Sequence, residues 1–192
     1  MTYGLIGYPL SHSFSQGYFT EKFTKLGLGA THQYLNFAIE NFQGFEELRA
    51  KHPDLKGINV TIPHKQNVIP YLDRLDPAAE HIGAVNCIRV EKDGTLTGFN
   101  TDYLGFQADL LTFLQEYDWT DKAYGLPFSE DLLETFLEET HALVLGTGGA
   151  SLAVHEALRE LGVTTQAVSR TAGKGRITYA DLSPALIQDH HL

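Results

Sequence analysis

Strand-like and helix-like segments alternate through the first hundred residues, and this alternation constrains the fold more than any other feature of the chain. In chain order, the expected strands are residues 3–7, 32–37 and 57–62, and the expected helices are residues 15–26 and 41–51. Such alternation predicts an α/β fold, in which helices pack on a sheet. On the first helix, Phe19, Phe23 and Leu26 recur at steps of four and three residues, so we expect them on one buried face.

The middle of the chain continues this mixed pattern. Residues 84–90 and 95–99 flank Lys92-Asp93-Gly94 as the strands of a hairpin would, and residues 64–72 and 101–117 have helical spacing. Residues 115–140 are interrupted by Gly125 and Pro127, after which Ser129 is suited to cap a further helix.

A glycine-rich loop joins a short strand to a helix in the last third of the chain. Apolar residues 141–145 lead into Gly146-Thr147-Gly148-Gly149-Ala150, a helix is expected near 151–161, and a second strand at 165–169. In this context the loop can bring backbone amides close to a pyrophosphate, although it can also be a tight turn without a ligand. Nucleotide-binding sheets are built from two three-stranded halves. Because only two strands and a short helix at 184–189 are predicted here, we expect the chain to be incomplete at its C-terminus.

Composition excludes several classes of protein. The formal charge is -10, with 24 acidic and 14 basic residues, whereas general nucleic-acid or anionic-membrane binders need a basic surface. Cys87 is the only cysteine, so no intrachain disulfide can form, and a reducing cytoplasm fits best. No apolar run approaches the roughly 20 residues of a membrane span. We therefore expect a cytoplasmic protein that acts on a small molecule.

A lysine and an aspartate each follow an apolar, strand-like run, where a rigid element can hold them in a cleft. Lys65 ends the run Asn59-Val60-Thr61-Ile62-Pro63-His64-Lys65, and Asp102 follows Gly98-Phe99-Asn100-Thr101. A lysine can exchange a proton with a substrate hydroxyl, and an aspartate can orient it. A solvated surface ion pair is the alternative. His64 is the competing proton-transfer group.

Asn59 and Thr61 are two residues apart in an extended segment, so their side chains are expected on one face, with Val60 and Ile62 toward the core. Such polar groups suit a polyhydroxylated ring, although they also satisfy backbone groups at strand ends. Asn86 can likewise bind a hydroxyl or close a turn.

Ser13 and Ser15 are also spaced to point to one side of an extended segment. Their hydroxyls, together with the amides at the start of the following helix, can hold a carboxylate. The alternative is that one of them only caps that helix.

The second strand of the glycine-loop unit is followed by Ser169-Arg170-Thr171. NAD-binding units place a carboxylate here, which would repel a 2′-phosphate, whereas a guanidinium group pairs with it. This position therefore favours NADP over NAD.

Taken together, these motifs resemble shikimate dehydrogenase from Gly4 to about Thr171, in the order of that family and near its spacing. Gln16, Cys87 and Ser169 depart from the residues usual there. The resemblance implies reversible, NADPH-dependent reduction of 3-dehydroshikimate to shikimate in aromatic amino-acid biosynthesis, without a metal. It also implies that Lys65 and Asp102 are the acid-base pair. Substrate would be bound by Ser13, Ser15, Asn59, Thr61, Asn86 and Asp102, and NADP(H) by Gly146, Thr147, Gly148, Gly149, Ala150, Ser169, Arg170 and Thr171.

The expected organisation is an α/β substrate-binding domain at 1–103, a connecting helix and an insertion at 104–140, and the first part of a Rossmann-like NADP-binding domain at 141–192. Two alternatives stay open: a dehydrogenase that accepts quinate or uses NAD, and a binding module that holds shikimate without turnover. The chain is expected to be a monomer or a homodimer.

Overall fold

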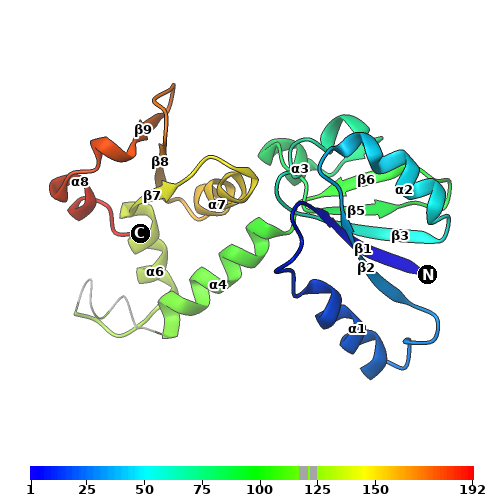
Figure 1. Cartoon of the computed structure of the whole chain (residues 1–192). Coiled ribbons are helices and arrows are strands. Elements are labelled where there is room, and N and C mark those ends of the chain that lie inside the picture. Colours follow the sequence, from blue (N-terminus) through cyan, green and yellow to red (C-terminus); the bar gives the residue numbers. More distant parts are fainter. Residues whose placement is uncertain (117–120, 122–124) are drawn as a thin grey trace. The chain divides into compact units, whose positions relative to one another are not determined.

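The computed structural model describes residues 1–116, 121 and 125–192. The chain forms two compact units, Met1–Asn100 and Thr101–Leu192, which we describe separately (Figure 1). In the described part of the chain, no helix is both long and apolar enough to cross a membrane.

The first unit is built on a six-stranded mixed sheet with the order β2-β1-β3-β5-β6-β4. Strand β1 pairs in parallel with β2 and β3, β5 pairs antiparallel with β3 and β6, and β4 pairs in parallel with β6. The strands are β1 Thr2–Gly7, β2 Gln33–Ala38, β3 Leu55–Val60, β4 Arg74–Leu75, β5 Cys87–Val90 and β6 Leu96–Phe99. The predicted α/β fold is confirmed, including the hairpin of β5 and β6.

Three short helices accompany this sheet: α1 Ser15–Lys25, α2 Phe45–Lys51 and α3 Pro77–Ile82. Helix α3 begins at a capping residue, because the Asp76 carboxylate accepts a hydrogen bond of 2.9 Å from the Ala79 amide. It ends at Gly83, whose φ of 69° is a left-handed conformation that glycine adopts readily. Single 3₁₀ turns lie at Phe42–Gly44 and Ile69–Tyr71.

One face of the sheet carries the main hydrophobic core of this unit. Ile6, Ile58 and Val60 point into it from neighbouring strands, and Phe45 and Leu48 of α2 pack against them. Because side chains alternate along a strand, Leu5 and Asn59, which are paired in register, point to the opposite face. The prediction for Val60 is confirmed, but that for Ile62 is wrong. Strand β3 ends at Val60, so the alternation does not extend to Ile62, which is 71% exposed.

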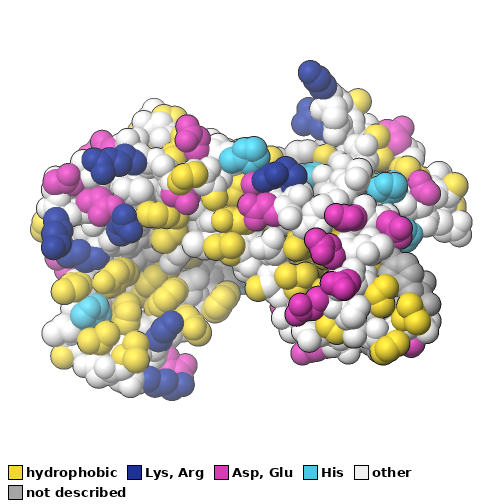
Figure 2. Space-filling model, turned by 180° about the vertical axis from the view of Figure 1, so that it is seen from behind, with side chains coloured by type: hydrophobic (Ala, Val, Ile, Leu, Met, Phe, Trp, Pro, Cys, Tyr) yellow, Lys and Arg dark blue, Asp and Glu magenta, His cyan; other side chains and the backbone are white. Residues whose placement is uncertain are grey.

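The predicted buried face of α1 is also wrong. No residue of α1 is buried, and Leu26, just after the helix, is 60% exposed. Phe19 and Phe23 reach the sheet only through ring contacts, Phe19 with Tyr34 and Phe23 with Tyr3. Figure 2 shows hydrophobic side chains gathered on the α1 side of this unit. Periodicity therefore identified Phe19 and Phe23 as residues that face the sheet, but it was wrong for Leu26 and for the burial of this face.

The helix predicted at residues 64–72 does not form. The chain makes turns here, stabilised by hydrogen bonds from the His64 amide to the Thr61 carbonyl (2.9 Å) and from the Val68 amide to the His64 carbonyl (3.0 Å). Pro70 lacks the amide that an α-helix would direct to Gln66, and proline disfavours helical geometry at the preceding residue. The segment therefore closes in a 3₁₀ turn.

The second unit contains a three-stranded parallel sheet with the order β7-β8-β9. Its elements are α4 Asp102–Glu116, α6 Glu130–Glu139, β7 His141–Leu145, α7 Gly149–Glu160, β8 Thr164–Ser169, β9 Arg176–Thr178, a 3₁₀ turn at Tyr179–Asp181, and α8 Pro184–Gln188. The prediction of only two strands is wrong. Strand β9 has three residues and begins with an arginine, so it lacks the apolar run that marks a buried strand.

A separate apolar core holds this unit together. Leu114 of α4, Phe136 and Leu137 of α6, Val144 of β7 and Leu158 of α7 are buried in it. Helix α6 is capped as expected, because the Ser129 hydroxyl accepts a hydrogen bond of 3.2 Å from the Leu132 amide. The insertion predicted within 115–140 lies partly outside the described residues.

Candidate functional site

Several of the predicted substrate residues of the first unit meet where β3 ends. The Val60 amide donates to the Asn86 carbonyl (2.8 Å), and the Asn86 amide donates to the Phe99 carbonyl (3.0 Å). Asn59, the neighbour of Val60, pairs in register with Cys87, the neighbour of Asn86. The ends of β3 and β6 and the start of β5 are therefore joined around Asn59 and Asn86.

Lys65 belongs to the same region, because its carbonyl accepts a hydrogen bond of 2.7 Å from the Val85 amide. Its side chain is half-buried, whereas the neighbouring His64 is 1% exposed. The Nε2 atom of His64 lies 2.6 Å from the Ile39 carbonyl oxygen, and the ring packs against Phe42. His64 thus anchors the turn inside the core. It is poorly placed to meet a ligand, which favours Lys65 over His64 as the proton-transfer group.

The two serines have different local roles. The Ser13 hydroxyl accepts a hydrogen bond of 3.3 Å from the Ser15 amide, which orders the start of α1. Ser15 lies near the Tyr34 hydroxyl and lowers its pKa slightly against the effect of burial. The Tyr34 hydroxyl itself donates to Asn59 Oδ1 over 2.8 Å. The Thr61 methyl group packs on Gly7.

Tyr34 was not found from the sequence. It is 4% exposed, and burial raises the pKa of its hydroxyl well above the ordinary tyrosine value, with a further increase from Cys87 nearby. Strand periodicity can place Tyr34 on one face of β2, but only the register of β2, β1 and β3 brings it to Asn59. No local signal in the sequence carries this register.

Asp102 is the first residue of α4 and lies in the second unit, whereas Lys65 lies in the first. A carboxylate in the first turn of a helix is favoured by the helix dipole, which accounts for its local position. The pairing of Asp102 with Lys65 stays a prediction.

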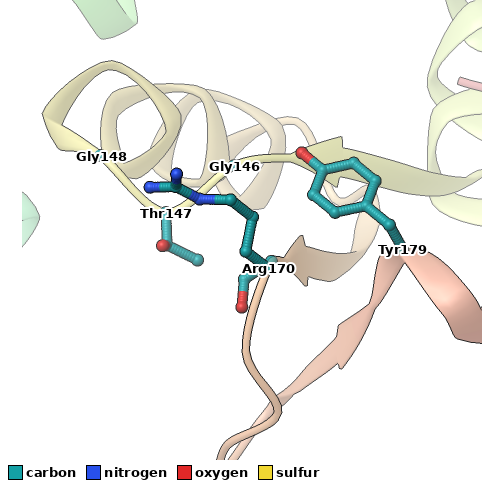
Figure 3. A pocket seen from close by; sticks show the side chains of 6 residues that line it. Gly146, Thr147, Gly148, Arg170 and Tyr179 are labelled. Carbon is teal, nitrogen blue, oxygen red and sulfur yellow. The ribbon is translucent and has the colours of Figure 1, made fainter.

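The glycine-rich loop of the second unit lies at the edge of a cavity of about 530 Å³. Six residues line this cavity: Gly146, Thr147, Gly148, Ser169, Arg170 and Tyr179. Gly146 has a φ of 122°, and Gly148 precedes α7 without a side chain that caps the helix. Figure 3 shows the Arg170 side chain extending beside the loop, with the Tyr179 hydroxyl also directed toward it.

Five of the eight predicted cofactor residues line this cavity, and Gly149, Ala150 and Thr171 do not. Ser169 is 5% exposed, and its hydroxyl bonds to the backbone of Thr171, accepting from the amide over 3.2 Å and donating to the carbonyl. This bonding shapes the turn after β8. Arg170 is exposed at the surface of that turn.

Tyr179 is the cavity residue that sequence reasoning missed. It follows β9 directly and is held by a capping box, in which Thr178 donates from its amide and its hydroxyl to the Asp181 carboxylate, each over 2.7 Å. The pattern Thr178-x-x-Asp181 is visible in the sequence and marks the start of a helical turn. Placing Tyr179 in the cavity requires the pairing of β9 with β8.

The chain is similar to known proteins over most of its length. Residues 5–88 match the family profile described as the shikimate dehydrogenase substrate binding domain. Shikimate dehydrogenase (NADP(+)) of Staphylococcus aureus strain Newman is 38% identical over 151 residues, which are 79% of this chain and 48% of that protein. The chain thus spans about half the length of the curated relatives it matches.

Solved structures give the same result. Shikimate dehydrogenase 1 of Peptoclostridium difficile is 30% identical, with a TM-score of 0.71 over 94% of this chain and 61% of that one. Shikimate 5-dehydrogenase of Thermus thermophilus, solved in complex with NADP(H) and shikimate, is 32% identical, with a TM-score of 0.66 over 89% of this chain and 56% of that one. The chain is therefore similar to shikimate dehydrogenases over most of its own length.

Proposed function

We propose that the chain takes part in the reversible, NADPH-dependent reduction of 3-dehydroshikimate to shikimate, a step of aromatic amino-acid biosynthesis. The observation that carries this proposal is the meeting of Asn59, Asn86 and Lys65 at one end of the first sheet, within the segment that matches the family's substrate-binding domain. A cytoplasmic location belongs to the same proposal.

The residues of the first unit suit a polyhydroxylated carboxylic acid. Ser13 and Ser15 supply hydroxyl groups beside the start of α1 for the carboxylate, and Asn59, Thr61 and Asn86 supply amide and hydroxyl groups for the ring. These are groups that can both donate and accept, as a sugar-like hydroxyl requires.

Lys65 is proposed to give a proton to the carbonyl oxygen as it becomes a hydroxyl, and to take one back in the reverse direction. Asp102 is proposed to accept a hydrogen bond from Lys65 or from the substrate hydroxyl. It would thereby orient the donor and balance its charge. The protein thus supplies the proton, and NADPH supplies a hydride when it is bound.

The cavity of the second unit fits the phosphate groups of NADP(H). At Gly146 and Gly148, a Cβ atom would meet no heavy atom of the described residues within 4 Å beyond the immediate chain neighbours, so the loop backbone is open to a ligand. The uncapped start of α7 offers amides and a favourable dipole to a pyrophosphate. The six lining residues include Arg170 and no carboxylate, which favours a 2′-phosphate.

A second candidate function is shikimate binding without turnover. The chain spans 48% of the Staphylococcus aureus relative, so binding and catalysis by the chain itself are separate questions. The first proposal has two variants, a wider substrate range that includes quinate and the use of NAD. Arg170 argues against the use of NAD.

Calorimetric titration with shikimate, run beside NADPH oxidation with 3-dehydroshikimate, tests these proposals. The expected result is shikimate binding together with NADPH oxidation that depends on 3-dehydroshikimate. Binding without oxidation would favour the binding module. Absence of both would contradict the assignment, and equal affinity for NADP and NAD would contradict the role of Arg170.

A further inference from the structure

A buried tyrosine hydroxyl holds one of the proposed substrate-binding side chains. Tyr34 Oη donates to Asn59 Oδ1 over 2.8 Å. The two residues come from β2 and β3 and are 25 positions apart. The phenol group therefore links two separate strands at the proposed substrate site.

The position of Tyr34 is set by strand pairing and by ring stacking. Tyr34 pairs in register with Tyr3 of β1, and Asn59 pairs with Leu5 of the same strand, so the Tyr34 ring reaches across β1 to Asn59. Phe19 of α1 covers the Tyr34 ring, with centroids 4.5 Å apart and planes tilted by 13°. Because the ring is buried and stacked on Phe19, its hydroxyl has little freedom to move.

The direction of the hydrogen bonds determines how Asn59 faces the cleft. A carboxamide has one acceptor oxygen and two N–H donors, so an occupied Oδ1 leaves Nδ2 as the group available to a ligand. In the opposite amide orientation, Nδ2 would instead donate to the phenol oxygen, and the acceptor Oδ1 would face the ligand. Burial raises the pKa of Tyr34, which keeps the phenol protonated and able to donate.

We propose that Tyr34 is a positioning residue for the substrate site, whose hydroxyl holds the Asn59 carboxamide with its Nδ2 donors toward the substrate hydroxyls. This proposal rests on the function proposed above. It adds a residue that acts through Asn59 and does not itself contact the substrate.

The orientation of Asn59 can be tested without a ligand. Two-dimensional NMR of the ¹⁵N-labelled chain resolves the two N–H signals of each side-chain amide. The signal pair of Asn59 is identified by its absence from the spectrum of Asn59→Ala. We expect Tyr34→Phe, which removes only the hydroxyl, to shift this pair. Tyr3→Phe is the matched control, since it removes a hydroxyl from the neighbouring position of the sheet, and it should leave the pair in place. An unshifted Asn59 pair in Tyr34→Phe would overturn the proposal.

Shikimate affinity then separates positioning from general structural support. Calorimetry should show about 5- to 30-fold weaker binding for Tyr34→Phe and no change for Tyr3→Phe, as expected when a buried acceptor loses its donor. If Tyr34 acts through Asn59, the double variant with Asn59→Ala should bind within about twofold of Asn59→Ala alone. Additive losses, or wild-type affinity in Tyr34→Phe, would overturn the proposal.

The outcomes also distinguish this inference from the proposed function. If the wild-type chain bound no shikimate, the proposed function would fail, and the amide shift would alone decide whether Tyr34 orients Asn59. Asn59→Asp provides a second variant if Tyr34→Phe folds poorly. It keeps an acceptor for the phenol but has no Nδ2 donors, so shikimate binding should weaken, and unchanged affinity would overturn the proposal.

Discussion

The two units of the chain prepare their candidate sites in different ways. In the first unit, side chains from distant segments are held by buried groups, as Asn59 is by Tyr34 and the Lys65 turn is by His64. In the second unit, the cavity is lined by a short loop, the turn after β8 and an exposed arginine. The first arrangement defines the positions of reacting groups, and the second offers backbone amides and one charge.

This difference matches what each proposed ligand would require. A small polyhydroxylated acid is distinguished by the directions of a few hydrogen bonds, so its partners need rigid side chains. A pyrophosphate is recognised mainly by charge and by amides that any residue carries, so glycine is sufficient. Changes in the first unit should therefore alter chemistry or selectivity, whereas changes in the second should mainly alter cofactor affinity.

The largest effect is expected for Lys65→Ala. Loss of a general acid lowers turnover by about 100- to 10,000-fold, whereas shikimate affinity should change little because other groups hold the ring. NADPH oxidation and calorimetric shikimate binding measure the two quantities. Lys56→Ala, an exposed lysine in β3, is the matched control and should behave as wild type. Near-normal turnover in Lys65→Ala would remove Lys65 from the proton-transfer role.

The second largest effect is expected for Arg170→Ala, and it should be limited to cofactor affinity. Loss of a charge-assisted contact with the 2′-phosphate weakens NADP binding by about 10- to 100-fold, and NAD binding should hardly change. Fluorescence titration with both cofactors measures this selectivity. Arg170→Lys keeps the charge but loses the paired geometry, so an intermediate affinity is expected. An equal loss of affinity for NADP and NAD would show that Arg170 does not bind the 2′-phosphate.

Gly146→Ala tests whether the loop depends on backbone conformation. Gly146 has a φ of 122°, which an alanine adopts only with strain, so the free energy of unfolding should fall by at least about 1 kcal/mol. Denaturant unfolding followed by circular dichroism measures it. Gly148→Ala is the matched control, since Gly148 has a φ of -84° and open space around it, and should keep its stability. Equal stability losses in both variants would argue against a conformational cause.

The smallest effect is expected from a surface carboxylate of the first unit. Hydrogen bonds from the Thr2 hydroxyl to Asp54, at 3.0 and 2.9 Å, lower the pKa of Asp54 below its ordinary value of 3.8. A carboxyl group whose pKa is lowered by folding stabilises the fold above its unfolded pKa, and this contribution is lost as the pH falls through the folded pKa. The melting temperature of Asp54→Asn should therefore depend less on pH below 3.8 than that of wild type.

Asp181 allows the same measurement in the second unit. Hydrogen bonds from Thr178 lower the pKa of the Asp181 carboxyl, so its contribution has the same sign and is lost in the same acidic range. Melting curves of Asp54→Asn and Asp181→Asn between pH 2 and pH 6, roughly the range over which paired carboxylates titrate, would show which unit is more sensitive to acid. An unchanged acid dependence in either variant would contradict the role of that carboxylate.

Local features of the sequence were sufficient for much of the fold. Strand β7 occupies the predicted residues, the Ser129 cap starts α6, and α8 begins at Pro184. Each depends on a pattern within a few neighbouring residues. The errors arose where a pattern was extended past its element, as at Ile62, or where the element was too short to show one, as in β9.

The candidate site shows the same difference between features set by neighbouring residues and features set by distant segments. The sequence by itself determined which chemical groups are present, namely the serine pair, the Asn59 and Thr61 strand end, Lys65, and the glycine loop followed by Arg170. Only the tertiary structure decided that His64 is enclosed, that Tyr34 donates to Asn59, and that Tyr179 lines the cavity beside the glycine loop. The physical reason is that caps, turns and periodicity are set by neighbouring residues. Strand register, in contrast, depends on packing between segments far apart in the chain.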